Sequence, residues 1–509
     1  MRGITLNRPI DSPTADAWQH KAAAPERQAA RRRAAPARCC ATYAHCGTHR
    51  DTTSRNAGVG AWRVAMKNLV IFHLESISRQ RLAEFAPAFP NTLRLMREGV
   101  VFDHFFSSAT STLMVLTYLF HGNDFEVDTS TTFEAMVPAR NNANLFSILQ
   151  DAGYRSNLIC LNGHAVTRPV RLLAWDDGLP RLWDTNDFPS LFARFDELTD
   201  GPPFAIYVWD LLTHIEHSLA LAPQSHGLTD QIERACAAAD YAVGLMRQTL
   251  ERKGLLDETL IVLYGDHGDD CWTHGFKGGM IHGTEPYTDI IATPFAIRDP
   301  GLEPGVRTDL CSTVDIAPTC LSLLGVDADM RFVHSGVNLA CARRDFAYAQ
   351  NFTANQPDRV EAGIAKAFSI TDRTYTLLAS SRGLEMYAHR LDPGNHCNLL
   401  HFFALDSSGR LVLHPSPLRA GHAVAAWKDN PQAVAAFAQD FARMRGALAA
   451  HVEAKRAYIV DRGIDPAHAL DRACLATLST QGRDAFFRAP PAPAPRPVTP
   501  AFEFSWKLR

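Results

Sequence analysis

The segment Asn68-Leu69-Val70-Ile71-Phe72-His73-Leu74-Glu75-Ser76 decides the fold class, because an apolar run there ends abruptly in polar residues. A short run of this kind is typical of a buried central strand. Leu260–Tyr264 repeats the pattern and ends in Gly265-Asp266-His267-Gly268. Other apolar runs alternate with helically spaced segments: Val100–Phe106, Ser156–Cys160 and Phe204–Trp209 with Asn91–Glu98, Asn144–Asp151 and Leu228–Lys253. The alternation predicts an α/β fold, with a mostly parallel central sheet and helices on both faces.

The sequence pattern changes after about Gly325. Three short strands are expected to follow and to pair antiparallel: Phe346–Gln350, Ala367–Thr371 and Tyr375–Ala379. The Ala-rich segment Gln432–Ala457 has helical periodicity. We therefore predict a main α/β domain at 66–330 and a smaller C-terminal antiparallel-sheet subdomain with added helices at 331–488. A Pro/Ala-rich tail follows at 489–509.

Residues 1–65 form a segment of a different kind. They hold Arg31-Arg32-Arg33 and repeated Ala and Pro, with few aliphatic residues in periodic order. Such a segment cannot bury enough apolar surface to offset the entropy of ordering it. We expect it to be disordered, or to be an extension assigned in error upstream of a true start at Met66. A transit peptide is the alternative.

The composition of the 509 residues excludes several function classes. The formal net charge is −3, which does not favour nucleic acid or an anionic membrane as partner. The 11 cysteines include no CxxC pair, so neither a disulfide framework nor a zinc ribbon is expected. No apolar run approaches the ~20 residues of a membrane span, and the chain starts without a signal-peptide pattern. We expect a cytoplasmic protein without a transmembrane anchor.

Polar residues stand where two of the predicted strands end. Glu75 follows the first apolar run, and Asp266 and His267 follow the later one. Ligands gather at the carboxyl ends of parallel strands, so these side chains are expected to converge. Two carboxylates and a histidine can hold a divalent metal ion. The alternative for Glu75 is a helix N-cap. Asp269 and Asp270 follow closely, and three neighbouring acids would repel one another unless a cation or a positive side chain lay nearby. The alternative is that Asp269 and Asp270 are simply solvated.

A hydroxyl-rich loop, Ser107-Ser108-Ala109-Thr110-Ser111-Thr112-Leu113, follows the strand Val100–Phe106. One interpretation is a cluster of N-cap residues that opens the next helix. The other is that one hydroxyl is a nucleophile whose pKa is lowered by a metal ion. The residues alone leave both interpretations open.

Six blocks, in order from about residue 68 to 400, resemble the sulfatase-like branch of the alkaline phosphatase superfamily. They are Asn68–Ser76, Phe89–Phe102, Asn144–Tyr154, Gly254–Gly268, Arg307–Gly325 and Glu385–Leu399. The resemblance implies a metal-dependent hydrolase or transferase that acts on a phosphate or sulfate ester. It also implies a two-step displacement, in which a covalent intermediate on a hydroxyl passes its group to water or to an acceptor hydroxyl.

Carried over residue by residue, the resemblance implies Glu75, Thr112, Asp266 and His267 as metal ligands. Thr112 is also the implied nucleophile, because relatives place a glycine ten residues after it, as Gly122 is here. The slightly different spacing of lipoteichoic acid synthase-like members points to Thr110 instead. His214 and His282 match catalytic histidines that bind the ester or protonate its leaving group.

Two further histidines, His274 and His217, are candidate substrate-binding residues. For His217 the alternative is an ordinary polar loop with Asp210 and Glu216, and a lone histidine such as His274 is often only a hydrogen-bonded structural residue.

Two departures from the family pattern narrow the substrate. The C/S-x-P-x-R motif of formylglycine sulfatases is missing, and a single Glu75 followed by Ser76 replaces the paired aspartates of calcium-dependent relatives. The chain thus resembles most the lipoteichoic acid synthase and phosphoethanolamine transferase group. This favours a phosphodiester, borne by a small molecule or a glycan.

The implied cofactor is one divalent metal ion. Zinc or manganese is favoured, and calcium or magnesium is less suited to a histidine ligand. Three alternatives remain: a sulfatase, a degenerate non-catalytic member, and a metal-dependent mutase, for which no second ligand set is found.

Overall fold

The computed structural model describes residues 66–125, 143–161, 181–185, 187–201, 203–214, 228–271, 273–274, 280–327, 334–351, 367–380, 382–408, 410–414, 425–461 and 475–479. The predicted segments 1–65 and 489–509, and His217, lie outside these residues. The domain boundaries assigned from sequence therefore stay predictions.

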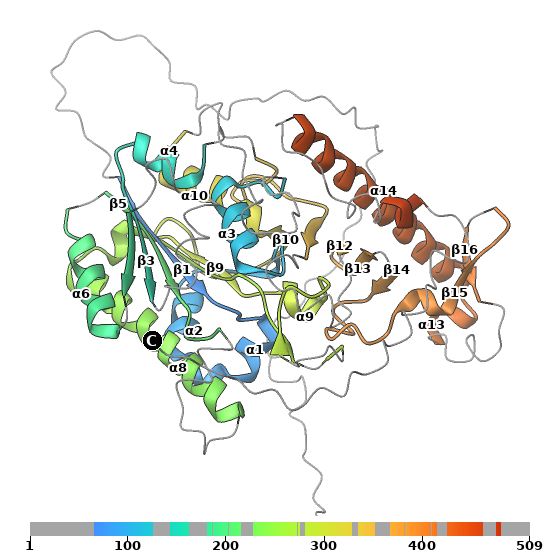
Figure 1. Ribbon diagram of the computed structural model, residues 1–509, viewed down its shortest axis with the longest axis horizontal. Helices are drawn as coiled ribbons and strands as arrows, with labels where there is room; N and C mark the ends of the chain where they lie inside the picture. Colours follow the sequence, from blue (N-terminus) through green and yellow to red (C-terminus); the bar gives the residue numbers. More distant parts are fainter. Residues whose placement is uncertain are drawn as a thin grey trace, which may run out of the picture. The chain divides into compact units, whose positions relative to one another are not determined.

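The described residues form a central eight-stranded sheet (Figure 1). Its spatial order is β10 (Gly305–Ser312), β2 (Val100–Phe106), β9 (Phe295–Arg298), β6 (Thr259–Gly265), β1 (Asn68–Leu74), β5 (Phe204–Asp210), β3 (Arg155–Leu161) and β4 (Arg181–Thr185). Every neighbouring pair is parallel except the two that include β9. The mostly parallel sheet predicted from sequence is confirmed.

Helices cover both faces of this sheet, and each face has its own core. One core joins Val70, Phe72 and Leu74 of β1 to four helices: α1 (Arg79–Glu84), α2 (Pro90–Arg97), α6 (Phe188–Leu198) and α8 (Leu228–Arg252). The other joins Leu69 and Ile71 to α3 (Thr112–His121), α4 (Leu145–Asp151) and α10 (Ile316–Leu324). Successive strand residues point to opposite faces, which is why one apolar run serves both cores.

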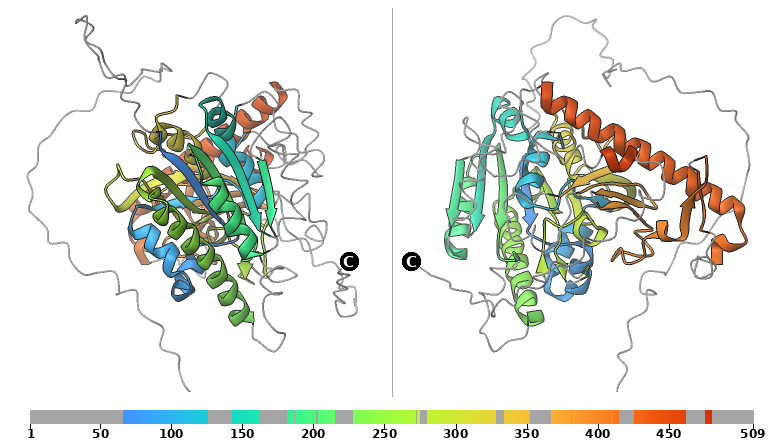
Figure 2. Two further views of the ribbon diagram at one scale, coloured as in Figure 1. Left: turned by 90° about the vertical axis from the view of Figure 1, so that its left-hand side faces the viewer. Right: turned by 45° about the vertical axis from the view of Figure 1, so that its right-hand side comes forward.

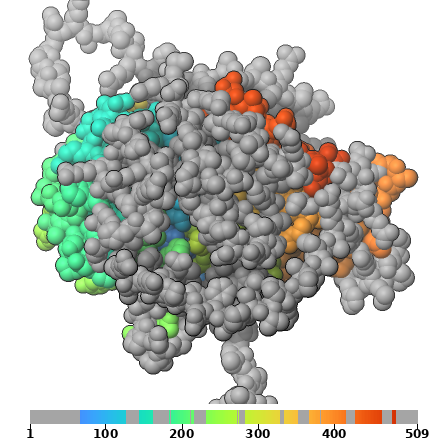
Figure 3. Space-filling view, in the orientation of Figure 1, coloured from blue at the N-terminus to red at the C-terminus, as the bar shows by residue number. Residues whose placement is uncertain are grey.

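A smaller antiparallel sheet follows in the chain, in the order β11 (Ala347–Gln350), β12 (Ala367–Thr371), β13 (Thr376–Ser380) and β14 (Gly383–Tyr387). The long helix α14 (Pro431–Asp461) packs along it through Phe437, Phe441 and Met444 (Figure 2, right). The predicted antiparallel subdomain is confirmed. In space-filling view, α14 lies across from the α4 and α6 side of the molecule (Figure 3).

Short elements complete the described structure: α9 (Thr288–Ile291), α13 (Ala425–Lys428), the pairs β7 (Asp270–Cys271) with β8 (Met280–Ile281) and β15 (Phe403–Leu405) with β16 (Leu411–Leu413), and 3-10 helices at Ala86–Ala88, Leu256–Glu258, Thr313–Asp315 and Leu399–Phe402. No helix in the ranges given above is both long and apolar enough to cross a bilayer.

Buried hydrogen bonds connect helix α14 to helix α3. Lys455 of α14 is 1% exposed, and its Nζ donates to the Tyr118 hydroxyl at 2.9 Å, to the Asp124 carbonyl at 2.7 Å and to Gln350 Oε1. Breaking such a buried set would leave acceptors unsatisfied, at a cost of about 1–3 kcal/mol each. The C-terminal part therefore helps to hold the helix that begins at Thr112.

Candidate functional site

Strand pairing brings Glu75 and Asp266 together. β1 and β6 are parallel neighbours, and Leu74 is in register with Gly265. The next residue of each strand therefore leaves the sheet at the same edge. Both carboxylates are fully buried, and His267 follows Asp266 into the same place. The convergence expected from the two strand ends is what the structure shows.

Tight backbone geometry makes this approach feasible. A Cβ on Gly265 would collide with the Ile77 carbonyl, and one on Gly268 would lie 2.5 Å from the Asp289 carbonyl oxygen. Only glycine permits such close packing. Ser76 has a φ of 54°, a left-handed conformation that costs free energy for a non-glycine residue. In that conformation its N–H donates to Asp266 Oδ1 at 2.9 Å, so the strain serves to orient a carboxylate.

Thr112 completes the cluster as the first residue of α3. Its Oγ1 donates to Glu75 Oε1 at 3.0 Å and lies 3.0 Å from His267 Nε2. Thr110 takes a different position, since its Oγ1 donates to the Thr284 carbonyl at 3.0 Å. Ser111, the N-cap of α3, makes no capping hydrogen bond through its side chain. The hydroxyl of Thr112 thus faces the buried carboxylate instead of capping the helix.

Electrostatics in the cluster call for a cation. Burial, and next the charge of Asp266, raise the pKa of Glu75 well above its usual range. For Asp266 burial acts in the same direction, but His267 and His73 outweigh it and hold its pKa below the usual range. Asp266 Oδ2 is buried and makes no hydrogen bond of normal geometry among the described residues. Two buried carboxylates, an imidazole and a hydroxyl form a donor set that fits a borderline divalent metal ion.

Surrounding residues fix both carboxylates. Trp209 Nε1 donates to Glu75 Oε2 at 2.6 Å, and the Thr213 hydroxyl donates to the Glu75 carbonyl at 2.6 Å. Each carboxylate therefore has one oxygen held by an N–H donor, Trp209 for Glu75 and Ser76 for Asp266. The other oxygen of each lies beside a proposed ligand residue: Glu75 Oε1 is 3.0 Å from Thr112 Oγ1, and Asp266 Oδ2 is 3.2 Å from His267 Nε2. His73 and Trp209 were missed by the sequence reasoning, because nothing in an apolar run marks them as polar partners.

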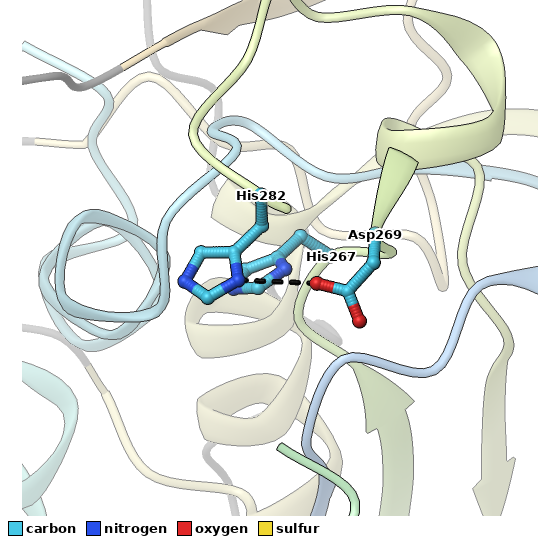
Figure 4. A group of neighbouring side chains, drawn as sticks. All are labelled: His267, Asp269 and His282. Carbon is cyan, nitrogen blue, oxygen red and sulfur yellow. Dashed lines mark hydrogen bonds and ion pairs between the residues drawn. The ribbon is translucent and has the colours of Figure 1, made fainter. Parts of the chain in front are cut away.

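A second cluster beside the first holds His282 (Figure 4). His282 Nδ1 lies 3.1 Å from Asp269 Oδ1, and its ring stacks on His267 with 4.5 Å between ring centroids. Arg81 Nη1 donates to Asp269 Oδ2 at 3.0 Å and so anchors that carboxylate. Although burial alone would raise it, the pKa of Asp269 is held below its usual range by His282 and Arg81. Asp269 is therefore an anchored partner of His282 and not a solvated acid.

His214 joins the same group of rings. Its ring meets His282 edge-on, with 5.1 Å between centroids. The structure thus brings His267, His282 and His214 together, with His267 in contact with Thr112. The catalytic roles of His214 and His282 stay predictions.

His274 belongs to a separate cluster with Asp270 and Asp289. It pairs with Asp270 and stacks on Tyr287 at 3.7 Å between centroids. Although burial alone would lower its pKa, the bond to Asp270 and the charge of Asp289 raise it. These contacts fit the alternative given for His274, a hydrogen-bonded structural residue, because its imidazole lies beside two carboxylates. Its substrate-binding role stays a prediction.

Replacing Asp289 by asparagine is expected to raise stability at neutral and alkaline pH. Burial raises the Asp289 pKa to about 7, above its unfolded value of ~3.9. A group with a raised folded pKa stabilises the protein below pH ~4 and loses that contribution as pH rises through 7. The Asn variant should gain roughly 2–4 kcal/mol relative to wild type at pH 8, and nothing at pH 4. Urea unfolding of both proteins at pH 4 and pH 8 checks this. An equal difference in unfolding free energy between the variant and wild type at the two pH values would contradict it.

Comparison with known proteins shows the family to which the chain belongs. The sulfatase family model matches residues 67–326, slightly more than half of the chain. The chain belongs to the sulfatase family, and the family expectation from sequence is confirmed. Lipoteichoic acid synthase of Staphylococcus aureus (strain USA300) is 34% identical over 82 residues, which are 15% of this chain and 13% of that protein.

Two solved structures share the fold. A 2-O GAG sulfatase is 14% identical, with a TM-score of 0.54 over 84% of this chain and 98% of that one. The protein yidJ from Bacteroides fragilis is 13% identical, with a TM-score of 0.52 over 78% of this chain and 98% of that one.

Proposed function

We propose that this chain is a metal-dependent enzyme that hydrolyses or transfers a phosphate ester, preferably a phosphodiester, with Thr112 as nucleophile. One observation carries the proposal. The Thr112 hydroxyl lies 3.0 Å from both Glu75 Oε1 and His267 Nε2, in a buried cluster with Asp266. A hydroxyl is costly to bury in such a place, and an alkyl group would pack there equally well. Packing therefore does not explain why a hydroxyl is present.

The metal would be held by Glu75, Asp266, His267 and Thr112 Oγ1. Zinc or manganese suits this mixture of oxygen and imidazole donors best. When bound, the ion would supply the positive charge that favours ionisation of a hydroxyl and polarises an ester.

The residues of the chain divide the remaining work. The Thr112 hydroxyl donates to Glu75 Oε1 at 3.0 Å, so the Glu75 carboxylate orients the nucleophile. Asp269 fixes the tautomer of His282 by accepting from Nδ1–H, which leaves Nε2 to exchange a proton with the substrate. His214 meets the His282 ring edge-on and would contact the leaving group.

A sulfate ester hydrolase is the second candidate. The matching family model and the fold shared with a 2-O GAG sulfatase favour it. The resemblance argues against it, because a formylglycine sulfatase needs a Cys or Ser where Thr112 stands, with the Pro and Arg that this chain lacks. The ester would be borne by a small molecule or a glycan in either case.

The test is a substrate panel. The purified full chain, with its metal content measured, is assayed against bis(p-nitrophenyl) phosphate, p-nitrophenyl phosphate and p-nitrophenyl sulfate. The proposal expects bound metal and the highest kcat/KM for the diester. Cleavage of the sulfate alone would establish the second candidate. A metal-free chain that turns over no ester would be the degenerate, non-catalytic member.

A further inference from the structure

His73 occupies an unusual position for a histidine, in the middle of the central strand. Strand register aligns it with Trp209 on β5 and with Tyr264 on β6. The three rings form one row, with centroid distances of 5.5 Å and 5.3 Å and interplanar angles of 5° and 27°. The His73 side chain is fully buried. Packing alone would be served as well by a phenylalanine, whereas a buried imidazole must find partners for both ring nitrogens.

The partners of the two nitrogens differ in kind. Nδ1 lies 2.8 Å from the Tyr207 hydroxyl, which lies 2.6 Å from the Tyr264 hydroxyl. A hydroxyl can donate or accept. Nε2 lies 3.2 Å from Asp266 Oδ2 and 3.4 Å from Glu75 Oε2, and an ionised carboxylate only accepts. The proton of a neutral ring therefore belongs on Nε2, with Tyr264 donating to Tyr207 and Tyr207 donating to Nδ1.

Nε2 of His73 faces both carboxylates. Neither contact has normal hydrogen-bond geometry on its own, as expected when one N–H lies between two acceptors. His73 meets Oε2 of Glu75, whereas Thr112 meets Oε1. The imidazole thus contacts the Glu75 oxygen that Thr112 does not use. On the other side Nε2 contacts Asp266 Oδ2, so the imidazole lies next to both carboxylates.

We propose that His73 is a positioning residue of the metal site: its Nε2–H, facing both carboxylates, orients Glu75 and Asp266, which would hold the cation. The proposal rests on the proposed function, because it concerns the affinity of that same site. Groups that orient metal ligands in this way typically change metal affinity by about 10–100-fold when they are removed.

Metal affinity in three variants tests the role. His73→Phe keeps a ring between Trp209 and Tyr264 but removes the N–H, and should weaken Mn²⁺ binding about 10–100-fold in calorimetric titration. His73→Gln places an amide N–H near Nε2 and should recover most of that loss. Tyr207→Phe removes the donor to Nδ1 and should cost about 10-fold. Tyr154→Phe is the matched control, because that buried hydroxyl donates to the Lys67 carbonyl away from the site.

The visible spectrum of the Co²⁺-loaded protein gives a second readout. A positioning residue leaves the coordination number unchanged, so wild type and His73→Phe should show the same band shape at saturation. A changed band shape would make His73 a ligand and overturn the proposal. Unchanged Mn²⁺ affinity in His73→Phe would show that the ring serves only packing, and would also overturn the proposal. Failure of the wild type to bind any divalent metal would instead sink the proposed function. If His73→Phe does not fold, equal affinity in wild type and Tyr207→Phe overturns the proposal.

Discussion

Replacing Thr112 by alanine is expected to reduce kcat for the diester by about 10³–10⁶-fold, the range seen when a hydrolase loses its nucleophile. The hydroxyl contacts Glu75 and His267 and does not cap its helix, so the change removes chemistry and leaves the fold intact. Thermal unfolding of the metal-free protein should differ little from wild type. Steady-state kinetics with bis(p-nitrophenyl) phosphate measures the effect.

Two companion variants separate the nucleophile from its neighbours. Thr112→Ser keeps a hydroxyl at the same atom and should retain turnover that alanine loses. Thr110→Ala removes a hydrogen bond to the Thr284 carbonyl, a loss of about 1 kcal/mol in stability, and should turn over within about tenfold of wild type. The assignment is wrong if Thr110→Ala is inactive while Thr112→Ala is active.

Replacing Asp266 by asparagine is expected to abolish the response to metal. Asp266 is fully buried, and its Oδ2 lies 3.2 Å from Nε2 of His267 and 3.2 Å from Nε2 of His73. Loss of its charge should weaken Mn²⁺ binding more than the 100-fold typical of a residue that only supports a ligand. Wild type should gain about 2.7 kcal/mol of stability at a metal concentration 100 times Kd, and the variant should gain almost nothing.

The matched control for this change is Asp299→Asn. Asp299 is also buried, but it pairs with Lys67 at 2.8 Å and belongs to none of the candidate metal clusters found among the described residues. Its metal-induced stabilisation should equal that of wild type. A full metal response in Asp266→Asn would show that the cation binds elsewhere.

The convergence of Glu75 and Asp266 could be predicted because it depends only on the parallel pairing of two apolar runs. Once β1 and β6 lie side by side, register alone places their next residues together. The spacing to Gly122 favoured Thr112, but it left Thr110 as an alternative because the two residues are only two positions apart. The choice depends on which hydroxyl turns inward where α3 begins, and the structure places Thr112 beside Glu75.

Side-chain pairs between residues far apart in the sequence could not be predicted. Arg81 and Asp269 are 188 positions apart, and nothing in either local pattern marks the partner. His73 resembled one more member of an apolar run. β9 was missed because Phe295–Arg298 is too short to show a period, and it enters an otherwise parallel sheet antiparallel to β2 and β6. The predicted cytoplasmic location stays a prediction.

The most direct test of the central claim is to trap the covalent intermediate. The metal-loaded protein is mixed with bis(p-nitrophenyl) phosphate, quenched with acid within one turnover, digested and mapped by mass spectrometry. The account predicts a p-nitrophenylphosphoryl adduct on Thr112 in wild type, formed with release of one p-nitrophenolate, and none in Thr112→Ala. An adduct on Thr110 or on any other residue would contradict it.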